Sequence, residues 1–256
     1  MHRTAAVLGL VLALAGCVTH TDRSDLAEWV GTTNHDERRP RLIVVHDTEM
    51  ESFDAALRVL TDPKRETRVS AHYLIGEDGR IVQLVSERAR AWQAGRSRWG
   101  GVPDVNSVSI GIELDNDGFE PFREPQILSL LYLLDDLCVR LGIERSQIVG
   151  HADVAPDRKA DPSLYFPWER LARAGFGRWP RDVRQPAPAG FDPIAALRAL
   201  GYDTHEPKWA IRAFHRRYRT LETFTLDELD LELLHDLQQQ VIAESTPPPQ
   251  PKPAAR

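Results

Sequence analysis

The sequence predicts an α/β fold, with a mixed central β-sheet flanked by helices, followed by a small C-terminal three-helix bundle. Between residues 41 and 180, short apolar runs rich in β-branched residues alternate with stretches of helical periodicity, which favours the α/β part. Residues 191–245 carry only helical signals, which favours the bundle. The proline-rich residues 181–190 lie between these regions and are expected to form a linker.

The overall composition is that of an ordinary globular protein. The chain has 256 residues, of which 42% are hydrophobic and 27% charged, so collagen-like, fully disordered and multi-span membrane classes are excluded. A formal net charge of −6 gives no general attraction to nucleic acid, and no nucleic-acid partner is expected. Two cysteines cannot build a disulfide framework. Nothing in the sequence specifies an oligomer, and a monomer is expected.

The N-terminal residues have the pattern of a lipoprotein signal peptide. A short basic start at residues 1–3 precedes an apolar run over residues 5–15, which is too short to span a bilayer. The run leads into Leu-Ala-Gly before Cys17, which resembles the bacterial lipobox. This resemblance implies removal of residues 1–16 and lipidation of Cys17. Since Val18 is not an aspartate, it also implies anchoring in the outer membrane, facing the periplasm. An ordinary secretory signal with a chance cysteine is the alternative.

Residues 17–40 are polar and predict a tether, and the region from residue 41 onward carries the signals of a sheet. A continuous β-branched run is typical of a strand buried on both faces, and a Glu-Asp-Gly-Arg turn between two apolar runs predicts a hairpin. The expected strands are 42–45, 73–75, 81–84, 108–114 and 148–149, and a helix is expected over 124–141. Cys138 lies on the apolar face of that helix, which favours a buried structural thiol over a catalytic one.

The helices expected in the C-terminal bundle have recognisable signals. Asp192-Pro193 caps a helix that runs to Leu200 and stops at Gly201. Residues 209–214 are amphipathic, and a capping box, Thr225 to Glu228, opens a helix to about residue 243. The proline-rich residues 246–256 predict a disordered tail.

Two of the nine histidines stand at the ends of predicted strands. His46 ends the strand that starts at residue 42, and His151 directly follows Ile148-Val149-Gly150. Side chains at strand ends in an α/β sheet converge on a shared crevice. Asp161 lies ten residues beyond His151 in a loop stiffened by prolines. Two imidazoles and a carboxylate leave one position open for water, as in catalytic zinc sites, so the sequence predicts Zn²⁺. Taken singly, a histidine is more often a surface or core residue than a ligand.

A zinc hydrolase also needs a proton shuttle and a group that stabilises the developing oxyanion. Glu113 ends the strand 108–114 and would take a proton from the attacking water and pass it to the leaving amine. Lys159 stands two residues before Asp161, and its ammonium would neutralise the tetrahedral oxyanion. The alternatives are a salt-bridged strand-end glutamate and an exposed loop lysine.

The segment Gly150–Pro162, GHADVAPDRKADP, closely resembles the zinc-binding loop of the zinc-dependent N-acetylmuramoyl-L-alanine amidases. These are related to phage lysozyme-type amidases and peptidoglycan recognition proteins. Val45-His46 and the segments 70–75 (SAHYLI), 91–95 (AWQAG) and 106–113 (NSVSIGIE) match that family in order and spacing. The resemblance covers about residues 40–170.

This resemblance implies a zinc amidase domain over residues 41–180. Its zinc ligands would be His46, His151 and Asp161, with Glu113 as the catalytic acid and base and Lys159 as a stabiliser of the transition state. Further candidates, for contacts with the muropeptide, are Asn106, Arg96 and Trp92.

The sequence departs from the family pattern at three positions. Gln93 replaces the histidine of AWHAG. Ala71 stands where some relatives carry tyrosine, which excludes a tyrosine-assisted mechanism at that position. Asp47 follows His46 where relatives often have Tyr or Asn, and it would either orient His46 or face solvent. None of these departures removes a proposed ligand.

The bundle expected over residues 191–245 resembles the peptidoglycan-binding domain often appended to such enzymes. Residues 210–218, AIRAFHRRY, are similar to its AI-x-AFQ helix, with His215 at the usual glutamine. A generic three-helix bundle is the alternative. Because the lipid anchor, the linker and the amidase motifs all favour the same substrate, we expect a wall-binding role.

The resulting functional prediction is zinc-dependent hydrolysis of the amide bond between N-acetylmuramic acid and L-alanine in peptidoglycan or muropeptides. The main alternative is a non-catalytic peptidoglycan-binding lipoprotein, but such binders typically lack a metal ligand and all three are present here. A zinc peptidase that cuts within the stem peptide is disfavoured, because no HExxH motif occurs.

Overall fold

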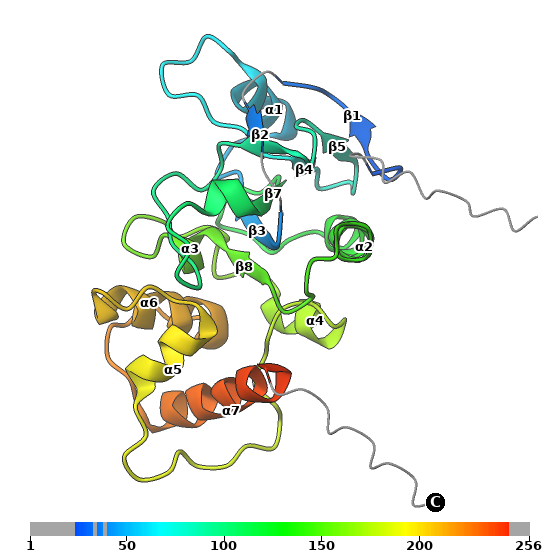
Figure 1. Cartoon of the computed structure of the whole chain (residues 1–256). Helices are drawn as coiled ribbons and strands as arrows, with labels where there is room; N and C mark the ends of the chain where they lie inside the picture. Colours follow the sequence, from blue (N-terminus) through cyan, green and yellow to red (C-terminus); the bar gives the residue numbers. More distant parts are fainter. Residues whose placement is uncertain (1–23, 33–34, 38–39, 246–256) are drawn as a thin grey trace, which may run out of the picture.

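The computed structural model describes residues 24–32, 35–37 and 40–245 (Figure 1). Six strands form one mixed sheet in the order β1-β5-β4-β7-β3-β8. In that order they span Glu28–Trp29, Ile81–Gln83, Tyr73–Ile75, Ser109–Leu114, Leu42–Asp47 and Ile148–Gly150. Strands β4, β7, β3 and β8 are parallel to one another, whereas β5 is antiparallel to β4. A second, antiparallel pair joins β2 (His35–Glu37) to β6 (Ala89–Ala91).

The register of the parallel strands brings their carboxyl ends together. His46 of β3 pairs with Glu113 of β7, and Val45 pairs with Gly150 of β8. His151 follows Gly150 and opens α3 (His151–Val154), a single helical turn. Both histidines and the glutamate therefore lie at one edge of three neighbouring strands, where open α/β sheets bind their ligands.

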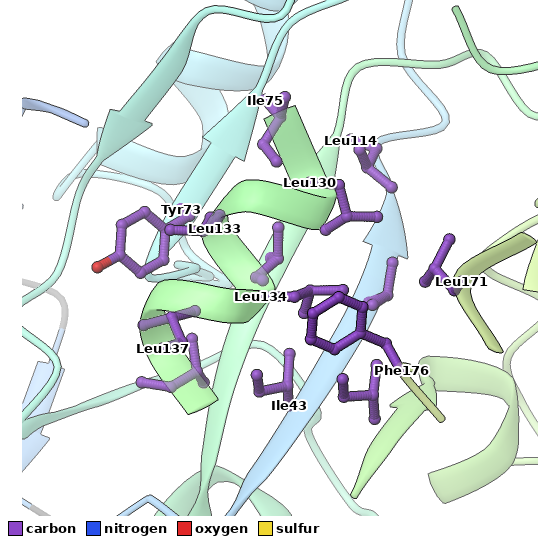
Figure 2. Packing of buried hydrophobic residues seen from close by; sticks show 14 of the residues in the cluster. Ile43, Tyr73, Ile75, Leu114, Leu130, Leu133, Leu134, Leu137, Leu171 and Phe176 are labelled. Carbon is purple, nitrogen blue, oxygen red and sulfur yellow. The ribbon is translucent and has the colours of Figure 1, made fainter. Parts of the chain in front are cut away.

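One face of the sheet is covered by α2 (Glu124–Leu141), with α4 (Trp168–Arg173) nearby (Figure 1). Leucines of α2 pack on strand residues that include Ile43 and Tyr73 (Figure 2). Ile43 is fully buried, as its place in a continuous apolar strand predicts. Cys138 belongs to the same buried cluster, and burial raises the pKa of its thiol to about 11. The predicted burial of this thiol is confirmed.

The other face of the sheet carries two groups of helices. Helix α1 (Phe53–Thr61) covers β4 and β5, while α5 (Pro193–Leu200), α6 (Pro207–Arg219) and α7 (Glu228–Ser245) cover β3 and β8. One buried cluster joins two residues of β3 to residues from all three C-terminal helices, among them Leu42, Val44, Leu197, Phe214 and Leu234. The C-terminal bundle is therefore continuous with the core of the sheet.

The structure confirms the predicted fold class and most of the predicted elements. The helices over 124–141 and 193–200 have the expected bounds, and the amphipathic segment lies inside the longer α6. Helix α7 starts at Glu228, but the reciprocal backbone-to-side-chain hydrogen bonds at its start join Asp227 and Asp230 instead of the predicted Thr225 and Glu228. The carboxylate of Asp227 caps the helix in place of the Thr225 hydroxyl, because an aspartate oxygen can also accept a hydrogen bond from a free backbone N–H of the first turn.

Other elements were not expected from the sequence. These are α1, α3 within the segment predicted as a loop, α4, the 3-10 turn η1 (Val105–Val108), β6, and the strands β1 and β2 within the segment predicted as a tether. The signal peptide (residues 1–16), the candidate lipidation site Cys17 and the tail 246–256 lie outside the described residues. Among the described residues, no helix is long and apolar enough to cross a membrane.

Candidate metal centre

The structure brings the three predicted metal ligands together at the carboxyl edge of the sheet. The Nδ1 atom of His46 lies 2.9 Å from Oδ2 of Asp161, and Nδ1 of His151 lies 3.0 Å from the same oxygen. One donor atom from each residue lies within 4.8 Å of the other two, and all three side chains are buried. The loop that carries Asp161 folds back towards His151, where the Ala152 backbone N–H donates to the Asp161 carbonyl at 2.7 Å.

The outer nitrogens of both imidazoles face fixed acceptors. Nε2 of His46 lies 2.6 Å from Oε1 of Gln93, and Nε2 of His151 lies 3.3 Å from the Ala94 carbonyl oxygen. These oxygens accept hydrogen bonds, so each Nε2 carries a hydrogen. In a neutral imidazole the lone pair is then on Nδ1, which faces Asp161.

The orientation of Gln93 is fixed by a chain of hydrogen bonds. Its Nε2 donates to Ser109 Oγ at 2.7 Å, and that hydroxyl donates to the Val105 carbonyl at 2.7 Å. The side chain lies over Gly111, where an added Cβ would be 2.6 Å from Gln93 Cγ. The sequence singled out Gln93 only as a departure from AWHAG. The contact of Gln93 with His46 was not predicted from the sequence. The available signal was that Gln93 lies inside AWQAG, a segment that matches the amidase family.

The ionisation of the cluster suits a cation. Burial raises the pKa of Asp161, but His151 and His46 outweigh that effect and hold it well below its usual range. Burial lowers the pKa of His151 to about 4, so this imidazole is neutral at pH 7. Burial also acts to lower the pKa of His46, yet the carboxylates of Glu113 and Asp161 raise it overall. A divalent metal would displace the proton from His46.

A cavity of about 160 Å³ opens beside the cluster and is lined by Glu113, Lys159 and Trp92 among others. Burial raises the pKa of Glu113 to about 7, and its Oε2 accepts no hydrogen bond from the described part of the chain. Lys159 Nζ lies 3.6 Å from Oδ1 of Asp161, and its side chain is 35% exposed. The cavity therefore contains a proton acceptor and a partly exposed cation next to the candidate ligands.

Two other candidates from the sequence lie outside this cavity. Asn106 is buried, and its Oδ1 accepts hydrogen bonds from the backbone N–H groups of Gln93 and Ala94 at 3.1 and 2.8 Å. Arg96 is largely exposed, pairs with Asp157 and lines a neighbouring cavity. Their contact with a muropeptide stays a prediction.

Asp47 takes neither of the two roles considered for it. It is buried, and its Oδ2 accepts a hydrogen bond from the Ser163 backbone N–H at 2.7 Å. It thereby joins β3 to the loop that follows Asp161. Burial raises its pKa to about 6.

Comparison with known families and proteins agrees with this site. The family model described as N-acetylmuramoyl-L-alanine amidase matches residues 36–164, which include every candidate ligand. The chain belongs to this amidase family. The amidase is 37% identical over 204 residues to N-acetylmuramoyl-L-alanine amidase AmiD of Escherichia coli K12, covering 72% of each chain. It is also 35% identical over 151 residues to the 1,6-anhydro-N-acetylmuramyl-L-alanine amidase AmpD of the same organism, covering 53% of this chain and 82% of AmpD.

Solved structures give the same assignment. E. coli AmiD, in complex with anhydro-N-acetylmuramic acid-L-Ala-D-γ-Glu-L-Lys, superposes with a TM-score of 0.69 at 34% identity, covering 80% of this chain and 90% of AmiD. AmpDh3 of Pseudomonas aeruginosa also has a TM-score of 0.69, at 29% identity, covering 80% of this chain and 93% of AmpDh3. These relatives support the predicted catalytic amidase over the non-catalytic binder.

Proposed function

We propose that this amidase uses zinc to hydrolyse the amide bond between N-acetylmuramic acid and L-alanine in peptidoglycan or its fragments. The observation that carries the proposal is the buried cluster of His46, His151 and Asp161 beside the carboxylate of Glu113. Membership of the amidase family supports the bond cleaved, and the cluster supports the metal.

The donor set fits zinc. Two imidazoles and one carboxylate are typical protein ligands of a catalytic Zn²⁺, and three of them leave a coordination position open. Oδ2 of Asp161 lies within 3.0 Å of Nδ1 of both histidines, so one atom from each side chain converges as the ligands of a single cation would. The histidines would bind through Nδ1, while Gln93 and Ala94 hold their outer N–H groups. Such outer hydrogen bonds orient metal-bound imidazoles.

Bound zinc would supply a Lewis acid that polarises the amide carbonyl and makes water more acidic. The Glu113 carboxylate takes a proton from the attacking water and delivers it to the leaving nitrogen of L-alanine. Its pKa of about 7 suits both steps near neutral pH. The Lys159 ammonium stabilises the negative oxygen of the tetrahedral intermediate, a role worth roughly 3 kcal/mol when the group is well aimed. Trp92 provides one wall for the substrate.

The test is mass spectrometry of the products from defined muropeptides with and without the 1,6-anhydro sugar. The anhydro form is included because the AmiD complex contains an anhydro-muropeptide. We expect release of free stem peptide that is lost on chelation and restored by zinc, and a Glu113→Gln chain that is inactive. Full activity in the metal-free protein would refute the zinc proposal. Products that keep L-alanine on the sugar would indicate a peptidase, and an inactive zinc-loaded parent would favour the binder.

We also propose that the amidase is anchored through a lipid on Cys17 to the outer membrane, on its periplasmic face. The lipobox-like Leu-Ala-Gly-Cys segment supports this location. Labelling of the chain with palmitate, together with membrane fractionation, tests it. We expect a labelled parent in the outer-membrane fraction and an unlabelled, soluble Cys17→Ser chain. A soluble, unlabelled parent would contradict the anchor.

The predicted wall-binding role of residues 191–245 rests on the resemblance of α6 to a peptidoglycan-binding helix. Co-sedimentation of the Glu113→Gln chain with purified peptidoglycan tests it, because that chain would leave the polymer intact. We expect binding that is reduced by substitutions on the exposed face of the bundle. A chain that remains in the supernatant would contradict it.

A further inference from the structure

Helix α6 contacts the loop that carries the candidate ligands. The guanidinium of Arg212 donates from Nη1 to the carbonyl oxygens of Pro156 and Lys159, each at 3.2 Å. One turn later, Nη2 of Arg216 donates to the carbonyl oxygens of Ala160 and, at 3.4 Å, Pro162. Two arginines of the C-terminal bundle therefore occupy the backbone acceptors on both sides of the segment that presents Lys159 and Asp161.

These arginines are held in place from the other side. Glu222 accepts a hydrogen bond from Nη2 of Arg212 at 2.9 Å and pairs with Nη1 of Arg216. The side chain of Arg216 is only 8% exposed and that of Arg212 18%. A guanidinium has five donors in a rigid plane, so it holds a carboxylate and carbonyls in a fixed geometry, whereas a lysine ammonium offers three donors on a flexible stem.

A third arginine supports the turn that carries His151. Nη1 of Arg217 lies 2.7 Å from Oδ2 of Asp153, and that oxygen also accepts from the Gly150 backbone N–H at 2.8 Å. Tyr202, between α5 and α6, donates its hydroxyl to Oδ1 of Asp153 at 2.9 Å. The carboxylate that caps α3 is thus held from both sides by the C-terminal bundle.

We propose that α6 is a clamp on the metal-binding loop, with Arg212 and Arg216 as positioning residues for Lys159 and Asp161. The inference rests on the proposed function in taking this loop as the one that binds zinc. The clamp itself is inferred from the hydrogen bonds described above. It makes residues 207–219 part of the support of the active site, in addition to any contact they make with the cell wall.

The full-length chain with Arg216→Met tests the clamp, with Arg212→Met as a second variant that removes a more exposed side chain. The matched control is Arg219→Met. Arg219 lies on the same helix and is also 18% exposed, but it pairs with Asp227 and Asp230 inside the bundle. Three quantities are measured for each chain: the melting temperature, hydrogen exchange of residues 151–162 without metal, and the dissociation constant for zinc.

In both clamp variants we expect faster exchange of the loop, including the amides of Ala152 and Lys159, and a zinc dissociation constant about tenfold higher. Arg216→Lys should restore only part of either property. Arg219→Met should lower the melting temperature and leave loop exchange and zinc affinity at parental values. Unchanged loop exchange in both clamp variants, or equal changes in Arg219→Met, would overturn the clamp. A parent chain that binds no zinc would refute the proposed function instead, and the exchange data would still decide the clamp.

Discussion

Replacement of Gln93 by leucine should weaken zinc binding without removing a ligand. The change keeps the size of the side chain but deletes the oxygen that lies 2.6 Å from Nε2 of His46. It also deletes the donor to Ser109, whose hydroxyl keeps its own bond to the Val105 carbonyl. The main loss is therefore the acceptor for a buried imidazole N–H, since His46 is only 2% exposed.

The size of the effect follows from two separate estimates. A buried donor left without an acceptor costs about 1–3 kcal/mol. Loss of an outer hydrogen bond to a metal-bound histidine weakens metal affinity by about 10- to 100-fold. At about 1.4 kcal/mol per factor of ten, that range is about 1.4–2.8 kcal/mol, so the two estimates agree. We therefore expect the zinc dissociation constant of Gln93→Leu to be about 10- to 100-fold higher than that of the parent.

The assay is a competition titration of zinc against a chromophoric chelator, followed by amidase activity at saturating zinc. Gln126→Leu is the matched control, because Gln126 is also buried and lies on α2, where its amide donates to the backbone carbonyls of Ile75 and Asp115. That control should lose stability but keep its zinc affinity. Parental zinc affinity in Gln93→Leu, or an equal loss in the control, would refute the role assigned to Gln93.

Three further predictions concern stability, measured by urea denaturation. Arg140→Met should cost about 3–5 kcal/mol, because it leaves the carboxylate of Glu87, which is 0% exposed, without its bidentate partner. Metal-free Glu113→Gln should be more stable than the parent at pH 8. The raised pKa of about 7 means that the folded parent loses stability as the pH rises from about 4.5 to 7, on the order of 3 kcal/mol. Gly111→Ala should cost about 1–3 kcal/mol, because the new Cβ would lie 2.6 Å from Gln93 Cγ.

Each of these predictions has a control or a contrary outcome. Arg173→Met removes an exposed pair with Glu169 and should leave the free energy of unfolding nearly unchanged, so an equally small cost for Arg140→Met would contradict the buried pair. The advantage of Glu113→Gln should vanish at pH 4, and an advantage independent of pH would argue against an ionised carboxylate as its cause. Gly111→Ala with parental stability and zinc affinity would mean that Gln93 moves aside without cost.

The ends of the parallel strands could be predicted because their sequence signal is strong. A continuous apolar run such as Leu42–Val45 fixes a buried strand, and the polar residue after it must emerge at the strand's end. That logic placed His46, Glu113 and His151 at one edge before the register of β3, β7 and β8 was known.

The contacts around that edge could not be predicted in the same way. The bond between Gln93 and His46, and that between Arg217 and Asp153, join residues 47 and 64 positions apart on different elements. No local periodicity encodes such a pair, since it depends on how the elements pack. Helix α1 was missed although Ser52 caps it through Oγ, because a nine-residue helix gives a short pattern beside stronger strand signals.

The arrangement of the clamp has a consequence for the order in which the protein is made. His46, Glu113, His151 and Asp161 are all part of the chain once residue 161 has been added, yet α6 follows only at residues 207–219. A growing chain thus holds the full set of candidate ligands before the arginines that steady them exist. Since distant contacts also form slowly, the supported site is completed late in folding. On the clamp proposal, the metal-binding loop would gain its full support only after residues 207–219 have been synthesised.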